Sequence, residues 1–226
     1  MAGRIIVVTG AFGVLGSAVA AAAARQGATL ALIDYAADGP APDGALKLGG
    51  VDLADPIQTE QAIARVVETH GGLDALLNIA GGFVWQTLEG GPLDAWPGLY
   101  RLNTVTAATA CRAAIPHLRN SAAGRIVNVG ANAALKAGMG MGAYAASKAG
   151  VHALTQSLAE ELKADNITVN AVLPSILDTP ANRADMPDAD PSAWVAPADL
   201  AEVMLFLAGE AAGAVTGALV PVTGRV

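Results

Sequence analysis

The sequence predicts a single-domain, doubly wound α/β fold, in which a parallel sheet carries helices on both faces. Apolar segments of strand length alternate along the chain with longer segments of helical period. The strand-like segments are continuous runs of Val, Ile and Leu, which is typical of parallel strands that are buried on both faces. At 226 residues, the chain is long enough for one α/β domain and short for two. We therefore expect residues 1–226 to form one domain.

The boundaries of the elements follow from this alternation. Strands are expected at residues 4–9, 29–33, 74–79, 125–129, 168–173 and 219–222. Helices are expected at residues 14–26, 56–70, 105–119, 143–164 and 197–208. Pro56 and Pro197 would each stand in a first helical turn, where the missing N–H leaves no bond unmade. Segments 36–44 and 175–196 contain several turn-forming residues and are expected to be loops.

Composition and charge exclude several classes of protein. Hydrophobic residues make up 53% of the chain and charged residues 15%, which excludes a disordered or coiled-coil protein. The net charge of −7 opposes binding to a phosphate backbone, so no nucleic-acid partner is expected. The most apolar stretch, residues 17–24, ends at Arg25, well short of the ~20 residues of a membrane span. No membrane association is expected.

The N-terminus and the residue types that bind metals add two further expectations. The first residues lack the layout of a signal peptide, and the single Cys111 forms no internal disulfide, so a cytoplasmic location is expected. His70, His117 and His152 are scattered, with no second ligand at metal-binding spacing. We therefore expect no metal site and interpret the histidines as surface or packing residues.

The first predicted strand leads directly into the sequence TGAFGVLG at residues 9–16, which opens the first predicted helix. Gly10 permits a tight turn, Gly13 lets the backbone approach a pyrophosphate, and Gly16 lets helix and strand pack closely. The helix N-terminus adds free N–H groups and positive potential. This arrangement predicts a dinucleotide site of the Rossmann type, although the spacing G-x-x-G-x-x-G differs from the usual G-x-G-x-x-G. The expected contact residues are Gly10, Phe12, Gly13, Val14, Leu15 and Gly16.

Asp34 ends the second predicted strand, 18 residues after Gly16. An acidic residue at about this distance binds the hydroxyls of the adenosine ribose in dinucleotide sites. Its carboxylate would repel a 2′-phosphate, so NAD(H) is predicted as the cofactor in preference to NADP(H). An ordinary aspartate in a strand-end turn is the alternative interpretation.

Tyr144 and Lys148 are four residues apart in a predicted helix, so both lie on one face, one turn from each other. An isolated tyrosine has a pKa of about 10. A neighbouring ammonium and a positive nicotinamide ring would favour the phenolate, which lowers this pKa and brings proton transfer toward neutral pH. The pair therefore predicts a general acid.

Together these residues resemble the short-chain dehydrogenase/reductase family, from Thr9 to about Gly224. The resemblance implies that Tyr144 and Lys148 are catalytic and that Asn103 anchors a water-linked proton relay. It implies too that Tyr144 and Lys148 contact the cofactor, with Lys148 holding the nicotinamide ribose. It also implies contacts to adenine, to the dinucleotide through an N-x-A-G motif at residues 78–81, and to the carboxamide. The further cofactor contacts implied in this way are Asp52, Leu53, Asn78, Ala80, Gly81, Pro174, Leu177 and Thr179.

The chain departs from the family at one catalytic position. The family's catalytic serine lies 13 residues before the tyrosine, and that position is Ala131 here. No serine or threonine occurs from residue 130 to residue 143, so a small shift of the alignment restores no hydroxyl. Asn132 is the nearest polar side chain, and both a substitute donor and a solvated or helix-capping role remain open for it.

This departure resembles the dihydropteridine reductases, a branch of the family that lacks the serine. The longest similar string, LPSILDTPANR at residues 173–183, belongs to the segment that would cover the substrate. Phe83 and Trp85, together with Ala131 and Asn132, are the candidate substrate-pocket residues; plain core aromatics are the alternative. A quinonoid ring spreads the incoming charge over its heteroatoms, whereas a ketone oxygen needs a donor beside it. Loss of the serine should therefore affect ketone chemistry more.

The sequence thus predicts an oxidoreductase that transfers a hydride from NADH to a quinonoid pterin-like ring or to another conjugated or carbonyl acceptor. Two alternatives stay open: an ordinary ketone or alcohol oxidoreductase similar to 3-oxoacyl reductases, and a catalytically weak NAD-binding sensor or subunit. The resemblance also implies a homodimer or homotetramer built on helices 105–119 and 143–164. The second of these has a face of small residues, Ala146, Ala149, Gly150 and Ala153.

Overall fold

The computed structural model describes residues 1–226 and confirms the predicted fold class. Its seven strands form one parallel sheet in the order β3-β2-β1-β4-β5-β6-β7. The strands are β1 Ile5–Thr9, β2 Thr29–Ile33, β3 Leu46–Leu48, β4 Ala75–Asn78, β5 Arg125–Val129, β6 Thr168–Pro174 and β7 Leu219–Val222. The helices are α1 Val14–Arg25, α2 Pro56–His70, α3 Ala95–Leu99, α4 Thr106–Leu118, α5 Gly142–Glu161, α6 Pro180–Asp185 and α7 Pro197–Ala208.

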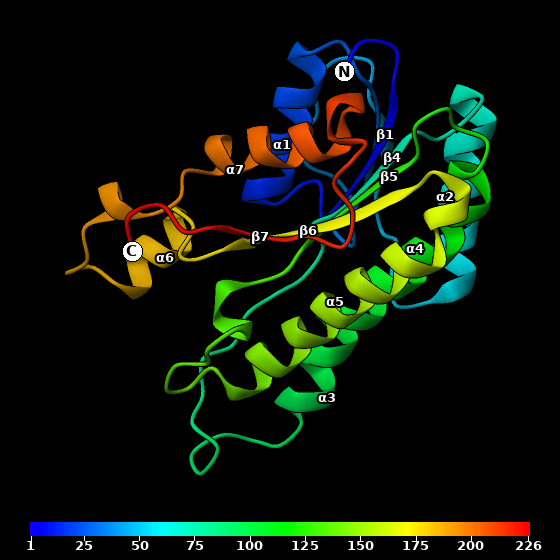
Figure 1. The fold of residues 1–226 in the computed structure, drawn as a ribbon. Helices are drawn as coiled ribbons and strands as arrows, with labels where there is room; N and C mark the ends of the chain where they lie inside the picture. The colour runs from blue at the N-terminus through cyan, green and yellow to red at the C-terminus, as the bar shows by residue number, and fades with distance from the viewer.

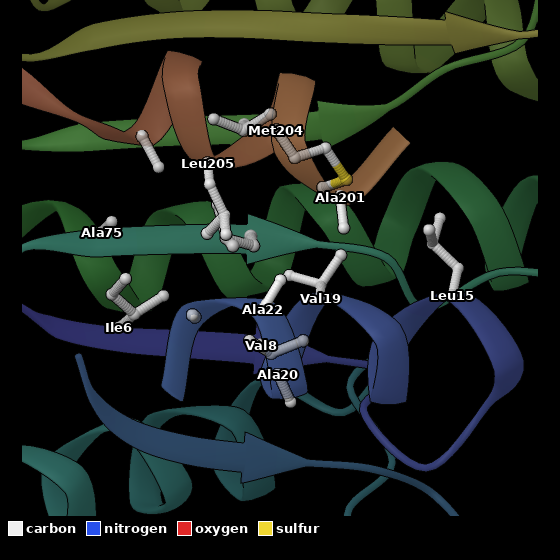
Figure 2. Close-up of a cluster of buried hydrophobic side chains, with 14 of the residues drawn as sticks. Ile6, Val8, Leu15, Val19, Ala20, Ala22, Ala75, Ala201, Met204 and Leu205 are labelled. Atoms are coloured by element: carbon white, nitrogen blue, oxygen red, sulfur yellow. The ribbon is translucent and has the colours of Figure 1, made fainter. Parts of the chain in front are cut away.

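The helices cover both faces of the sheet and make two hydrophobic cores. Figure 1 shows α1 and α7 on one side of the sheet and α2, α4 and α5 on the other. Figure 2 shows the first core, where Met204 and Leu205 of α7 and Val19 of α1 lie among side chains of the central strands. The second core joins the opposite face of the sheet to α2, α4 and α5. The central strands are thus buried on both faces, as their continuous apolar runs predicted.

The strand order reverses between β1 and β4, because β1 continues to β2 on one side and β4 continues to β5 on the other. The chains that leave the carboxyl ends of β1 and β4 therefore diverge and leave a crevice between them, where ligands of open α/β sheets bind. Thr9 lies at this point: its hydroxyl oxygen accepts the N–H groups of Ile79 at 3.0 Å and Ala80 at 3.2 Å. This side chain joins the end of β1 to the chain that follows β4.

Three elements differ from the sequence expectations. β3 was not predicted, because three residues at the sheet edge are too short to show a period. The helical region expected at residues 105–119 begins earlier in the chain. Before α4 come α3 and a π-helical segment, Tyr100–Val105. Pro97 and Gly98 concealed this extension, because neither favours a helix interior. The segment 175–196, expected to be a loop, contains α6, which begins at Pro180 with the hydroxyl of Thr179 as its cap.

The small-residue face of α5 does not point uniformly outward. Ala146, Ala149 and Ala153 are exposed and free to meet another molecule. Gly150 is partly buried, and a Cβ there would be 2.8 Å from the Thr104 hydroxyl oxygen. The interface itself stays a prediction. None of the helices is long and apolar enough to cross a membrane.

Candidate active site

The glycine turn between β1 and α1 forms the floor of the site. Gly10 has a φ of +61°, which only glycine adopts readily, and a Cβ there would be 2.7 Å from the backbone nitrogen of Ala80. A Cβ at Gly16 would overlap the carbonyl oxygen of Gly10. Gly13 is the N-cap of α1 and supplies no side-chain cap, so the first N–H groups of the helix stay open to an anion. Gly10 and Gly16 thus have the predicted roles in the tight turn and the close packing, while the approach of a pyrophosphate to Gly13 stays a prediction.

A cavity of about 830 Å³ opens above this turn. A volume of this size suits a large organic ligand such as a dinucleotide. Its charged side chains are three carboxylates, Asp34, Asp38 and Asp52, and one guanidinium, Arg101. The predicted cofactor residues that line it are Gly10, Phe12, Gly13, Val14, Leu15, Gly16, Asp34, Asp52, Leu53, Ala80 and Gly81.

Asp34 ties the end of β2 to the glycine turn. One carboxylate oxygen accepts the N–H of Phe12 at 2.9 Å, and the other accepts the N–H of Ala36 at 2.9 Å. The second bond is the local turn bond of the alternative interpretation, and the first joins Asp34 to the glycine turn. Binding of the ribose hydroxyls by Asp34 stays a prediction. A carboxylate oxygen has a further lone pair, so Asp34 can still accept a hydroxyl from the cavity.

Asp52 also lines the cavity and forms an ion pair with Arg101. The Arg101 Nη2 lies 2.8 Å from Oδ2 of Asp52, while Oδ1 accepts the N–H of Ala54 at 2.9 Å. Arg101 belongs to the π-helical segment that also carries Asn103. Sequence reasoning missed Arg101, because nothing in its local pattern shows that the chain returns to Asp52 across 49 residues.

Tyr144 lies in the first turn of α5 with its ring against Phe83. The ring centroids are 4.9 Å apart at an interplanar angle of 88°, an edge-to-face contact. Burial raises the pKa of Tyr144 to about 12. Desolvation disfavours the phenolate in this arrangement. The lowering of this pKa by Lys148 together with a bound nicotinamide ring stays a prediction. The phenol keeps its proton at neutral pH.

Lys148 is buried one turn further along α5, and its Nζ donates to the carbonyl oxygen of Val129 at 2.8 Å. Burial lowers the pKa of Lys148 to about 8, since desolvation disfavours the ammonium. This places the protonation of Lys148 within reach of physiological pH. The ammonium is thus held at the carboxyl end of β5, beside the site.

Asn103 is held rigidly between two segments. Its Oδ1 accepts the N–H of Gly82 at 2.8 Å, and its Nδ2 donates to the Gly82 carbonyl at 3.0 Å and to the Ser147 hydroxyl at 2.9 Å. A Cβ at Gly81 would be 2.5 Å from Asn103 Oδ1 and 3.3 Å from Lys148 Nζ. Gly81 also lines the large cavity. This glycine therefore connects the cavity to the predicted catalytic residues.

The position expected to carry a serine is an alanine that is 2% exposed. Ala131 follows β5, and Asn132 opens a short 3₁₀ turn, Asn132–Ala134. The Asn132 side chain is partly exposed and makes no hydrogen bond within the protein, nor does it cap the turn. Its amide is available to a ligand, whereas the capping role is wrong.

Trp85 extends the aromatic side of the site. Its indole N–H donates to the carbonyl oxygen of Met139 at 3.0 Å, and its ring packs against Gly140, where a Cβ would overlap it. The segment after β4 is thereby joined to the segment before α5. Phe83 and Trp85 are both about half exposed, so they are not plain core aromatics.

Besides Tyr144 and Lys148, four predicted cofactor residues do not line the large cavity. Asn78 is buried within the sheet, where its amide donates to Asn128 Oδ1 at 2.9 Å and to Cys111 Sγ at 3.2 Å. Its role is to join strands. Pro174 ends β6, Leu177 pairs with Val195, and Thr179 caps α6, so these three form the start of the segment 175–196.

Of the two roles expected for the histidines, surface or packing, His152 has the packing role. It is only 6% exposed and lies on α5 one turn beyond Lys148, with its Nε2 3.3 Å from the backbone nitrogen of Ala131. The spacing of four residues after Lys148 was a visible signal. No cluster of His, Cys, Asp or Glu is placed to hold a metal ion.

Comparison with known proteins identifies relatives over the whole chain. The chain is 33% identical to L-rhamnose 1-dehydrogenase (NAD(P)(+)) of Sphingomonas sp. (strain SKA58), over 98% of this chain and 95% of that protein. It is 29% identical to the 3-oxoacyl-(acyl-carrier-protein) reductase of Thermotoga maritima, over 98% of this chain and 97% of that protein. Carveol dehydrogenase from Mycobacterium avium, solved in complex with NAD, has 26% identity and a TM-score of 0.87. That alignment covers 99% of this chain and 97% of the other.

The sequence model of the short chain dehydrogenase family matches residues 4–190. This range contains the glycine turn, the crevice between β1 and β4, and the side chains of Asn103, Tyr144 and Lys148. The geometry of the site and the match therefore agree: the chain belongs to the short-chain dehydrogenase/reductase family.

Proposed function

We propose that the chain is an NAD(H)-dependent oxidoreductase that transfers a hydride from NADH to a small-molecule acceptor, with Tyr144 as the proton donor. The observation that carries this proposal is Gly81, which lines the cavity and lies against both Asn103 and Lys148. The cavity fits a dinucleotide, because the glycine turn at its floor packs so closely that a Cβ at Gly10 or Gly16 would clash with the backbone. The bound cofactor would supply the hydride. The residues of the chain supply the proton and hold the cofactor and the acceptor in position.

The roles of the side chains follow from their contacts. Tyr144 keeps its proton in the buried site and gives it to the acceptor as negative charge develops there. The ammonium of Lys148, held on the carbonyl of Val129, then stabilises the phenolate that forms. Asn103 keeps the segment after β4 in place through its two bonds to Gly82.

The alanine at position 131 favours an acceptor that spreads its charge. A quinonoid pterin-like ring or another conjugated system needs no second donor beside the reacting atom, whereas a ketone does. The aromatic side chains of Phe83 and Trp85 at the site also suit a flat, conjugated ring. Tyr144 alone can then complete the reaction.

Ordinary ketone or alcohol oxidation is the second candidate function. The names of the relatives favour it, because they include a sugar dehydrogenase and a 3-oxoacyl reductase. In this case the free amide of Asn132 would replace the missing hydroxyl. A nucleotide-binding sensor is less well supported, because Tyr144, Lys148 and Asn103 are all present and assembled.

The preference for NADH is tested at Asp34. We expect the wild-type protein to favour NADH over NADPH by at least about tenfold in kcat/KM, since ~1.4 kcal/mol of like-charge repulsion has this effect. Asp34→Asn keeps a carbonyl oxygen as acceptor but removes the charge, and Asp34→Ala removes both. In steady-state assays, both variants should have a smaller ratio of kcat/KM for NADH to kcat/KM for NADPH than the wild type. The matched control is Asp38→Asn, a carboxylate of the same cavity that is paired with Lys47, and it should change the ratio less. Equal efficiency with NADPH in the wild type would refute the preference.

The role of Tyr144 is tested by an NADH-oxidation screen of a quinonoid dihydropterin, quinones, small ketones and 3-oxoacyl thioesters. With the best acceptor, Tyr144→Phe should lower kcat ~10²–10⁴-fold, because it removes the general acid, and leave NADH binding largely intact. Tyr100→Phe makes the same change at an exposed tyrosine and is the control. Lys148→Ala should impair both kcat and NADH affinity. Unaltered turnover in Tyr144→Phe would contradict the proposed acid.

The chemistry at position 131 is tested by Ala131→Ser. The substitution adds one hydroxyl beside the developing oxyanion and should raise kcat/KM for ketones, with little change for a quinonoid acceptor. Ala133→Ser, in the adjacent 3₁₀ turn, controls for an added hydroxyl elsewhere. An equal gain on both acceptor classes would mean that residue 131 does not select the chemistry.

We also propose a homodimer or homotetramer built on α4 and α5. The exposed Ala146, Ala149 and Ala153 allow the helices of two copies to approach closely. Light scattering at micromolar concentration should give twice or four times the chain mass. Ala149→Glu should lower the measured mass, because assembly would bury the new carboxylate at the interface. Lys163→Glu, outside this face, is the control. A monomeric wild type would refute the interface.

A further inference from the structure

Two side chains of α5, Lys148 and His152, form hydrogen bonds with the backbone at the carboxyl end of β5. Tyr144, Lys148 and His152 are spaced by four residues and therefore form one stripe along the helix. Family membership and the proposed function account for the first two. His152 is 6% exposed and has been given no role so far.

Lys148 and His152 bind the backbone on either side of Gly130. Lys148 Nζ donates to the Val129 carbonyl oxygen at 2.8 Å, and His152 Nε2 accepts the N–H of Ala131 at 3.3 Å. Because Nε2 accepts, the imidazole is neutral and carries its proton on Nδ1. The two bonds together fasten the end of β5, and the first residue after it, to α5.

Gly130 makes room for the imidazole. A Cβ at this position would be 2.6 Å from His152 Nε2 and 2.8 Å from Cδ2. The φ of Gly130 is not positive, so backbone conformation does not require a glycine here. The contact with His152 is therefore the reason for the missing side chain.

The bond from His152 matters because Ala131 has no other anchor for its amide. Ala131 is 2% exposed, so its N–H cannot turn to solvent, and its methyl group forms no polar contact. A buried donor without a partner is costly, and the backbone would shift to avoid it. Burial and the charge of Lys148 both lower the pKa of His152, which keeps it able to accept.

We propose that His152 is a positioning residue, which holds residue 131 against the acceptor site through the amide of Ala131, with Gly130 as its matched partner. Asn132 follows directly in the chain and opens the 3₁₀ turn that begins after Ala131. The effect on turnover rests on the proposed function, whereas the bond itself does not.

Amide exchange and nitrogen-15 NMR of the full chain test the bond without any activity. In the wild type, Nε2 should show the shift of an unprotonated nitrogen and the Ala131 amide should be protected. Protection should persist in His152→Gln, whose carbonyl oxygen can accept, and fall at least about tenfold in His152→Leu, which cannot. A protonated Nε2 in the wild type, or equal protection in both variants, would overturn the proposal.

Kinetics with the best acceptor of the screen test the consequence. His152→Leu should lower kcat about ten- to hundredfold through misplacement of residue 131, with NADH affinity changed less than about threefold. His152→Gln should recover most of kcat. A role in stability alone would leave kcat per NADH-binding site unchanged in His152→Leu, which would refute positioning. If the wild type fails to oxidise NADH with every acceptor of the screen, the proposed function is refuted. The NMR result still decides whether the bond between His152 and Ala131 exists.

A double-mutant cycle tests the pairing with Gly130. Gly130→Ala should lower kcat in the wild-type background, because its Cβ meets the imidazole. In the His152→Ala background, Gly130→Ala should lower kcat only slightly, since the imidazole no longer occupies the space beside residue 130. Ala133→Gly, next to the site, is a control for altered backbone freedom. Equal losses from Gly130→Ala in both backgrounds would overturn the pairing.

Discussion

Gly10 lies so close to the chain after β4 that a Cβ there would be 2.7 Å from the backbone nitrogen of Ala80. The rest of the site depends on this approach. It occurs where the strand order reverses, so the segments after β1 and β4 meet at their origins and then diverge around the cavity. Thr9 fastens the same point by accepting the N–H groups of Ile79 and Ala80. The segment that continues to Gly81 is thereby placed beside both the cavity and Lys148.

The second support of the site is the contact between α5 and the end of β5. Most of the buried surface of α5 is made of small or apolar residues, but Lys148 and His152 form hydrogen bonds with the backbone at the strand end. The buried Thr155 continues this anchoring, since its hydroxyl accepts the amide of Asn128 from β5 at 2.9 Å. The position of α5 is thus defined by polar bonds to β5 as well as by apolar packing.

Burial controls the electrostatics of the two proposed catalytic residues in opposite directions. Desolvation raises the pKa of the Tyr144 phenol and lowers that of the Lys148 ammonium, so both neutral forms are favoured. The cavity itself is lined by carboxylates, of which Asp52 is paired with Arg101 and Asp34 accepts two backbone N–H groups. Neither carboxylate forms a hydrogen bond with Tyr144 or Lys148.

Local patterns were enough to predict the central strands, the glycine turn and the pair Tyr144–Lys148, because a period or a short spacing lies within one element. They did not reveal β3, whose three residues form a strand only by pairing with β2, or the π-helical entry to α4. The ion pair of Arg101 with Asp52 and the bond of His152 to Ala131 join residues 49 and 21 positions apart. The pKa direction of Tyr144 likewise depends on what covers the ring. Such contacts arise only when the sheet brings distant segments together, and no local pattern encodes them.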